Sequence, residues 1–158
     1  MTTEEAITGC PKISLDDYQI GQVSYSSSYG QVYIATDKKT GKKVAIKLTM
    51  PDNNKEIFLR SFIREVNTAN LNLPGIVRIV GYRFPLSEKN NGSEFDGKYI
   101  IVSEFVENGS LDDLTKQYLN SNGQQHDKMN PTIRSKVIFG IAATMKKLHK
   151  MNIIHRDL

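Results

Sequence analysis

Three groups of residues have types and spacing that could do chemistry. Lys47 ends the run Val44-Ala45-Ile46-Lys47, and a lysine inside a strand beside a small alanine can hold phosphate over a flat ring. Glu65 lies in a later stretch with helical spacing and could pair with this lysine. His155-Arg156-Asp157-Leu158 closes the sequence, and an aspartate held after a His-Arg pair can accept a proton from a substrate hydroxyl.

Two of these residues also have simpler interpretations. Strand alternation puts Lys47 on the face opposite Ile46, where an edge lysine could simply face solvent. Taken alone, that interpretation of Lys47 is the simpler one. Glu65 lies within about 60° of Phe58 and Phe62 on a helical wheel, and a carboxylate inside an apolar stripe is costly unless it is paired. Pairing with Lys47 and hydration at the rim of the stripe both stay open.

The elements that must position these residues follow from the pattern of the chain. Strand-forming residues begin at Tyr18, and the run 29–49 is predicted to be a hairpin with a turn over 37–41. The other expected elements are a helix at 55–70, strands at 76–84 and 98–106, and helices at 110–119 and 131–149. The strand at 98–106 is nearly all apolar in its middle, which predicts a central place in the sheet. This order predicts an α+β fold, with a small sheet region followed by a helical region.

Composition and charge narrow the class of protein. The 158 residues are 39% apolar and 24% charged, which is typical of one globular domain. A single cysteine, Cys10, excludes an internal disulfide, and a reducing cytoplasmic setting is expected. No apolar run approaches the roughly 20 residues of a membrane helix, and residues 1–10 do not resemble a signal peptide. The net charge of +4 is mild, and the lysines near the hairpin turn are interpreted as a solvated tip rather than a nucleic-acid surface.

Several motifs occur in a characteristic order. They are Gly30-Gln31-Val32-Tyr33, Val44-Ala45-Ile46-Lys47, Arg64-Glu65-Val66, Glu104-Phe105-Val106-Glu107-Asn108-Gly109-Ser110-Leu111, Leu148-His149 and His155-Arg156-Asp157-Leu158. With these motifs, residues 16–158 resemble a eukaryotic-type protein kinase. The resemblance implies a protein-kinase-like fold, with residues 1–14 as a flexible tail, 15–106 as the N-lobe and hinge, and 107–158 as the start of the helical C-lobe.

The resemblance also implies roles for individual residues. Lys47 would contact the α- and β-phosphates of ATP, Glu65 would hold Lys47 by an ion pair, and Asp157 would be the catalytic base. The residues expected around adenine are Val32 and Ala45, which would pack on the ring, Ser103 at the gatekeeper position, and the hinge residues Glu104 and Val106. The implied partners are ATP and a protein substrate, with Mg²⁺ expected for the complete domain.

The phosphate loop departs from the family pattern. Counting back from Val32, the glycine positions fall on Tyr25, Ser27 and Gly30, and the position before the loop falls on Ser24. Because glycine allows close approach of the backbone to phosphate, the two substitutions are expected to weaken ATP binding. A second alignment takes Gly21 as the first glycine and lengthens the loop. The first alignment is preferred because residues 17–21 are typical of a strand that leads into the loop.

The sequence printed here stops at Leu158, directly after Asp157. In the family, the magnesium-binding asparagine, the Asp-Phe-Gly motif and the activation segment come later. We therefore expect that this polypeptide alone does not transfer phosphate. The predicted helix at 131–149 has apolar residues around most of its circumference, so we expect it to expose an apolar patch that could bind another chain.

Two alternative functions were weighed. A non-catalytic, pseudokinase-like module that binds nucleotide weakly, or binds another protein, is favoured by the altered phosphate loop and the apolar helix. A dinucleotide-binding Rossmann unit is set aside because no Gly-x-Gly-x-x-Gly turn joins a strand to a helix. Between hydroxyl types, the run 107–111 resembles the Ser/Thr and tyrosine-kinase-like groups, which implies serine and threonine substrates.

Overall fold

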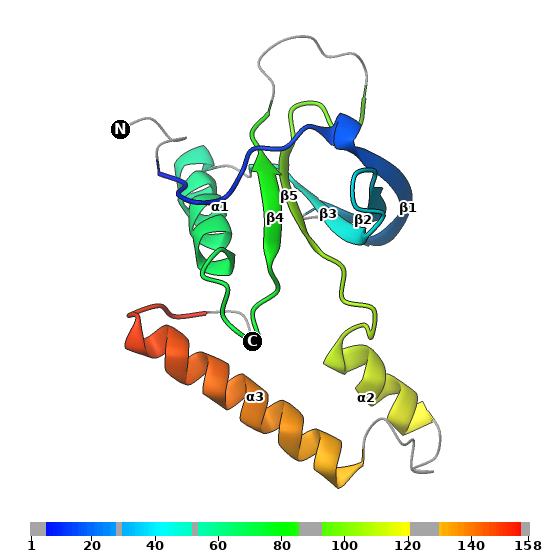
Figure 1. Ribbon diagram of the computed structural model, residues 1–158, viewed down its shortest axis with the longest axis vertical. Coiled ribbons are helices and arrows are strands. Elements are labelled where there is room, and N and C mark those ends of the chain that lie inside the picture. The colour runs from blue at the N-terminus through cyan, green and yellow to red at the C-terminus, as the bar shows by residue number, and fades with distance from the viewer. Residues whose placement is uncertain (1–5, 28–29, 52–53, 86–92, 121–129, 156–158) are drawn as a thin grey trace. The chain divides into compact units, whose positions relative to one another are not determined.

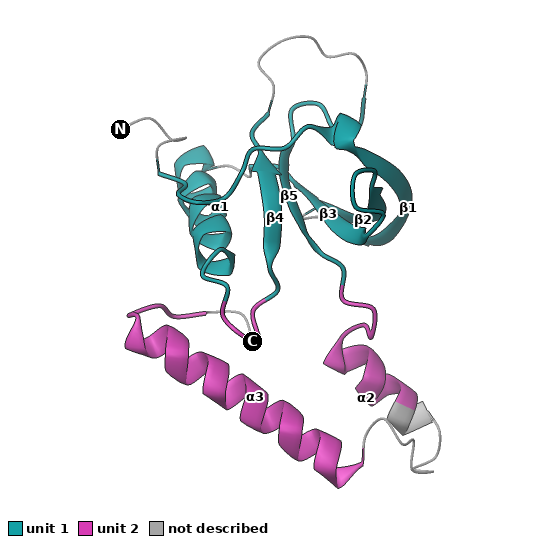
Figure 2. Ribbon diagram, viewed as in Figure 1, with its two compact units in different colours: residues 1–72, 77–105 teal, residues 73–76, 106–158 magenta. Residues whose placement is uncertain are grey.

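The computed structural model describes residues 6–27, 30–51, 54–85, 93–120 and 130–155. They form two compact units, shown in teal and magenta in Figure 2. Unit 1 comprises Met1–Asn72 and Val77–Phe105, and unit 2 comprises Leu73–Ile76 and Val106–Leu158. The second unit begins close to the predicted boundary at residue 106. It also takes in residues 73–76, which the prediction had placed in the N-lobe.

Unit 1 is built on an antiparallel sheet whose strand order is β1-β2-β3-β5-β4 (Figure 1). Its strands are β1 (Tyr18–Ser27), β2 (Gly30–Asp37), β3 (Lys43–Thr49), β4 (Ile79–Arg83) and β5 (Tyr99–Glu104). The predicted hairpin is confirmed as β2 and β3, and β5 takes the inner position expected of an apolar strand. β4 is shorter than the predicted strand at 76–84, because the turn over 73–76 precedes it.

The two faces of the sheet are covered differently. One face carries an apolar core of Tyr18, Tyr33, Ala35, Val44, Ile46, Leu48, Ile100 and Val102. The predicted alternation in β3 is confirmed, because Ile46 and Leu48 are buried in this core while Lys47 lies on the other face. On that other face, Ile79 and Tyr82 of β4 and Ile101 of β5 pack against the helix that follows β3.

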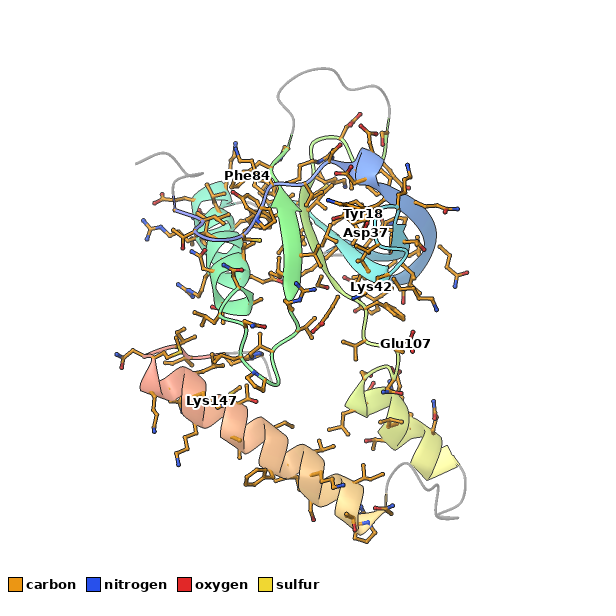
Figure 3. The ribbon with its side chains drawn as sticks, in the orientation of Figure 1. Tyr18, Asp37, Lys42, Phe84, Glu107 and Lys147 are labelled. Carbon is orange, nitrogen blue, oxygen red and sulfur yellow. The ribbon has the colours of Figure 1, made fainter. Side chains whose placement is uncertain are left out.

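This helix, α1, spans Lys55–Ala69 and confirms the prediction for 55–70. Asn54 caps it, since its Oδ1 accepts a hydrogen bond of 3.1 Å from the backbone N–H of Ile57. Phe62 and Val66 are its buried residues. The ring of Phe62 meets the rings of Tyr82, Phe84 and Tyr99, so aromatic edge and tilted contacts hold α1 against β4 and β5 (Figure 3 labels Phe84).

The segment before the sheet differs from its prediction. The sequence predicts a flexible tail over residues 1–14, but residues 6–14 run along α1 and β4 (Figure 1). Ile7 and Cys10 are buried in the same core as Phe62 and Val66. The prediction of a tail is therefore wrong for residues 6–14, because apolar side chains at irregular spacing are buried here by tertiary contacts. Residues 1–5 lie outside the described part of the chain.

Unit 2 contains helices α2 (Leu111–Asn120) and α3 (Pro131–Lys150), as predicted. The hydroxyl of Thr144 lies 2.9 Å from the carbonyl oxygen of Pro74, which ties the turn over 73–76 to α3. The expected exposure of α3 is confirmed at Ile138 and Phe139, which are 69% and 75% exposed. Among the described residues, none of the helices has the length and apolar character needed to cross a membrane.

Candidate functional site

Lys47 and Glu65 form an ion pair. The Nζ atom of Lys47 donates a hydrogen bond of 2.8 Å to Oε1 of Glu65. Lys47 comes from β3 and Glu65 from α1, so the pair joins the sheet to its helix. Both side chains are close to half exposed, at 44% and 46%. The two interpretations of Glu65 are therefore both partly met, because the carboxylate is paired with Lys47 and still lies at the wet rim of the apolar stripe.

The residues expected around adenine share one face of the sheet with Lys47. Val32 of β2 lies directly opposite Lys47 in the antiparallel register, and Ser103 of β5 lies opposite Ala45. Directly opposed residues in a sheet point to the same side. The sequence-predicted residues Val32, Ala45 and Ser103 are therefore brought together with Lys47, and all of these side chains are half-buried.

A cavity of about 560 Å³ opens beside the Lys47–Glu65 pair within unit 1. Its wall contains both members of the pair and the predicted loop residues Ser27 and Gly30. Its other lining residues are Ser26, Gln31, Leu48, Thr49, Met50, Pro51, Phe58, Ser61, Phe62 and Lys98. Val32, Ala45 and Ser103 do not line the cavity and lie further along the same face of the sheet.

The end of the β1–β2 hairpin fits the first of the two alignments of the phosphate loop. The final pairs of its ladder are Tyr25 with Val32, Ser26 with Gln31, and Ser27 with Gly30. Gly21 lies well inside β1, far from this end. Gly30 has positive φ, and a β-carbon there would overlap the carbonyl oxygen of Leu48. Of the three predicted glycine positions, the one that retains glycine is therefore one where a side chain does not fit.

The other predicted loop residues are more open. Ser24 lies in an irregular step of β1 between the paired residues Val23 and Tyr25, and its side chain is exposed. Tyr25 is 62% exposed. Neither of these two residues lines the cavity. Their assigned role near the nucleotide remains a prediction.

At the hinge, Glu104 ends β5 and is fixed by the chain before β4. Its Oε1 accepts a hydrogen bond of 3.0 Å from the backbone N–H of Arg78, and its own N–H donates to the carbonyl oxygen of Arg78 at 3.0 Å. Val106 belongs to unit 2 and is half exposed. The predicted catalytic base Asp157 and its neighbour Arg156 lie outside the described residues.

Sequence reasoning missed two polar residues of the cavity wall, Ser61 and Lys98. Lys98 precedes β5, and its Nζ lies 2.6 Å from the Sδ atom of Met50, which is also on the wall. No local pattern identifies these residues, because they reach the cavity from an exposed turn of α1 and from the start of β5. Lys47 and Lys98 together give the wall two cations, which suits an anionic ligand.

The comparison with known proteins decides the family. Residues 19–158 match the protein kinase domain. The chain belongs to the protein kinase family. Five antiparallel strands with α1 against the sheet, followed by the helices of unit 2, fit the N-lobe and part of the C-lobe of this family.

Curated relatives of this kinase chain are named as kinases of the Ser/Thr class. It is 32% identical over 143 residues to a probable serine/threonine-protein kinase PknB of Bifidobacterium longum, covering 89% of this chain and 19% of the relative. It is 34% identical over 143 residues to the serine/threonine-protein kinase PrkC of Bacillus subtilis, with the same coverages of 89% and 19%. An Aurora kinase of Yarrowia lipolytica is 31% identical over 157 residues, covering 96% of this chain and 37% of that protein. The kinase chain thus spans between a fifth and about two fifths of the length of these relatives.

The site suits the nucleotide part of the family's chemistry. Lys47 and Lys98 on the cavity wall, and the close approach of Gly30 to its neighbouring strand, fit a phosphate chain. Within the described residues, no three His, Cys, Asp or Glu side chains gather in a way that could hold a metal ion. We therefore assign no Mg²⁺ ligand there.

Proposed function

We propose that this chain binds ATP, with the phosphates in the cavity beside Lys47 and adenine further along the same face of the sheet. We propose further that the protein is an ATP-dependent kinase of serine and threonine hydroxyls. The observation that carries the proposal is the Lys47–Glu65 pair at 2.8 Å in the wall of a cavity of about 560 Å³. The names of the relatives support the serine/threonine class.

The geometry indicates what each residue does in binding. The ion pair with Glu65 holds the Lys47 ammonium at one place, so less side-chain entropy is lost when a phosphate oxygen takes a second hydrogen bond from it. Val32 and Ala45 offer half-buried apolar surface for a flat ring. Bound ATP would supply the transferable phosphoryl group, and Mg²⁺ would neutralise its charge.

Titration of the purified chain with ATP tests nucleotide binding. We expect the Lys47→Met variant to bind ATP at least about tenfold more weakly, because a charge-assisted hydrogen bond to phosphate is lost. The matched control is Lys42→Met, which removes a lysine from the exposed end of the β2–β3 hairpin and should leave the affinity unchanged (Figure 3 labels Lys42). Equal affinities of wild type and Lys47→Met, with both chains folded by circular dichroism, would show that ATP does not use this site.

The hydroxyl class needs a separate measurement. The protein isolated from its source cells is incubated with γ-labelled ATP and a mixture of proteins, and the labelled amino acids are identified after hydrolysis. Phosphoserine and phosphothreonine are expected. Phosphotyrosine as the main product would contradict this part of the proposal and leave the proposed ATP site untouched.

A second candidate function is a pseudokinase-like binding module. Tyr25 and Ser27 at two of the predicted glycine positions favour it, since side chains there oppose close contact between backbone and phosphate. The ATP titration separates the two functions. A wild-type chain without measurable ATP affinity would favour the module, and an affinity that depends on Lys47 would favour the nucleotide site.

A further inference from the structure

We propose that residues 6–13, here called the strap, position α1 and thereby hold Glu65 against Lys47. Asn67 and Asn70 at the end of α1 are the positioning residues. The inference rests on the proposed function, because it assigns the strap a part in the affinity for ATP. The strap precedes the matched kinase range of 19–158, so it is a feature of this chain outside the family pattern.

Three hydrogen bonds join the strap to α1. The side chain of Asn67 takes part in two of them: its Oδ1 accepts from the backbone N–H of Thr8 at 3.2 Å, and its Nδ2 donates to the carbonyl oxygen of Ala6 at 2.9 Å. The Nδ2 atom of Asn70 donates to the carbonyl oxygen of Thr8 at 3.0 Å. Gly9 follows with φ of +73°, and a β-carbon there would lie 2.7 Å from Nδ2 of Asn70. The backbone of the strap is thus fitted closely to the last turn of α1.

The other end of the strap is fixed to the sheet. The backbone N–H of Ile13 donates to the carbonyl oxygen of Tyr82 at 3.0 Å, and the N–H of Tyr82 donates to the carbonyl oxygen of Pro11 at 3.1 Å. Between the two ends, Ile7 and Cys10 are 8% and 9% exposed and are buried with Phe62 and Val66 of α1. The strap therefore connects α1 to β4 by directional bonds at both ends.

This connection bears on the nucleotide site because Glu65 lies beside Val66 and two positions before Asn67 on the same helix. The apolar contacts of Phe62 and Val66 with the sheet are non-directional, so by themselves they tolerate small shifts of the helix along its axis. The Lys47–Glu65 pair is nearly half exposed, and such pairs are too weak to fix a helix. The hydrogen bonds of Asn67 and Asn70 set the position of the helix that the pair requires.

The first test reads the strap and α1 without any nucleotide. Cys10 is the only cysteine, so the rate at which a thiol reagent labels the chain reports release of the strap. In an Asn67→Ala plus Asn70→Ala variant, we expect labelling and deuterium exchange of residues 55–69 to rise at least about fivefold. The matched control is Arg60→Ala, which removes an exposed ion pair with Glu56 on the same helix and should change neither rate. Faster labelling with unchanged exchange in α1 would overturn the proposal.

The second test asks whether the strap acts through Glu65. We expect the double asparagine variant to bind ATP about threefold to tenfold more weakly than wild type, and to cause no further loss in a Glu65→Gln background. The same loss in both backgrounds would overturn the proposal, because a general loss of structure does not depend on Glu65. If the double variant does not fold, Asn70→Ala alone is used. If wild type binds no ATP, the proposed function fails while the exchange measurement still decides whether the strap positions α1.

Discussion

Gly30 at the start of β2 lies so close to the carbonyl oxygen of Leu48 in β3 that a β-carbon at residue 30 would overlap this oxygen. The overlap is with backbone, which cannot move aside as a flexible side chain does. Gly30 also lines the cavity beside Lys47, so a shift of the strands here changes the wall of the site.

Replacement of Gly30 by alanine is therefore expected to destabilise the chain by about 2 kcal/mol and to weaken ATP binding. Urea unfolding and ATP titration measure the two effects. Gly140→Ala is the matched comparison, because no heavy atom lies within 4 Å of a β-carbon built there and the residue is inside α3. It should stabilise the chain by up to about 1 kcal/mol. Equal effects of the two substitutions would contradict this interpretation of Gly30.

Ser103 allows a prediction about the shape of the adenine site. It lies opposite Ala45, so two small residues face each other on the proposed nucleotide side of the sheet. We expect adenosine analogues with bulky N6 substituents to bind the wild-type chain and to bind Ser103→Met at least about tenfold more weakly, because the longer side chain fills the space. Unmodified ATP is the control ligand and should bind both chains alike. Equal binding of the bulky analogue to both chains would show that Ser103 does not border the ring.

Asp37 at the end of β2 predicts a pH dependence of stability. Its Oδ1 accepts hydrogen bonds from the backbone N–H groups of Thr40 at 3.1 Å and Lys39 at 2.8 Å, and these bonds hold the pKa of the carboxyl below its ordinary value (Figure 3 labels Asp37). A carboxyl with a lowered folded-state pKa stabilises the fold above its unfolded-state pKa. The stabilisation is lost as the pH falls through the folded-state pKa.

The measurement compares urea unfolding of wild type and Asp37→Asn between about pH 5 and pH 2. Asparagine keeps an oxygen acceptor but has no charge to lose. We expect wild type to be the more stable chain at the upper end of this range, and the difference to shrink toward the lower end. A difference that stays constant over the whole range would contradict the assignment to Asp37.

Ser110 and Asp113 predict the stability of the first turn of α2. The hydroxyl of Ser110 accepts from the backbone N–H of Asp113 at 3.1 Å, and the Asp113 carboxylate accepts from the N–H of Ser110 at 3.1 Å. This reciprocal pair is a capping box. Ser110→Ala is expected to cost about 1 kcal/mol, whereas Ser110→Thr should cost much less because it keeps the hydroxyl. Deuterium exchange of residues 111–117 measures the effect, and equal exchange in both variants would exclude a capping role.

Local pattern was sufficient for the elements and for the central pair. The alternation around Ile46 placed Lys47 on the correct face of its strand, because side-chain direction in a strand depends only on the neighbouring residues. Asn54 and Asn130 were identified as caps of α1 and α3, because the polar side chain of a cap bonds to backbone in the next turn. The resemblance to protein kinases then supplied the pairing of Lys47 with Glu65, which the structure confirms.

The tertiary structure decided everything that depends on contacts between distant parts of the chain. Residues 6–14 have no periodic pattern, yet Cys10 is buried because α1 and β4 offer it an apolar surface. Lys98 reaches the cavity wall because β5 inserts between β3 and β4, and chain order alone does not show this crossover. Short-range patterns reflect the period of a strand or helix, which each segment carries within itself. Burial and side-chain partners depend on which segments meet, and this is determined by the packing of the whole sheet with α1.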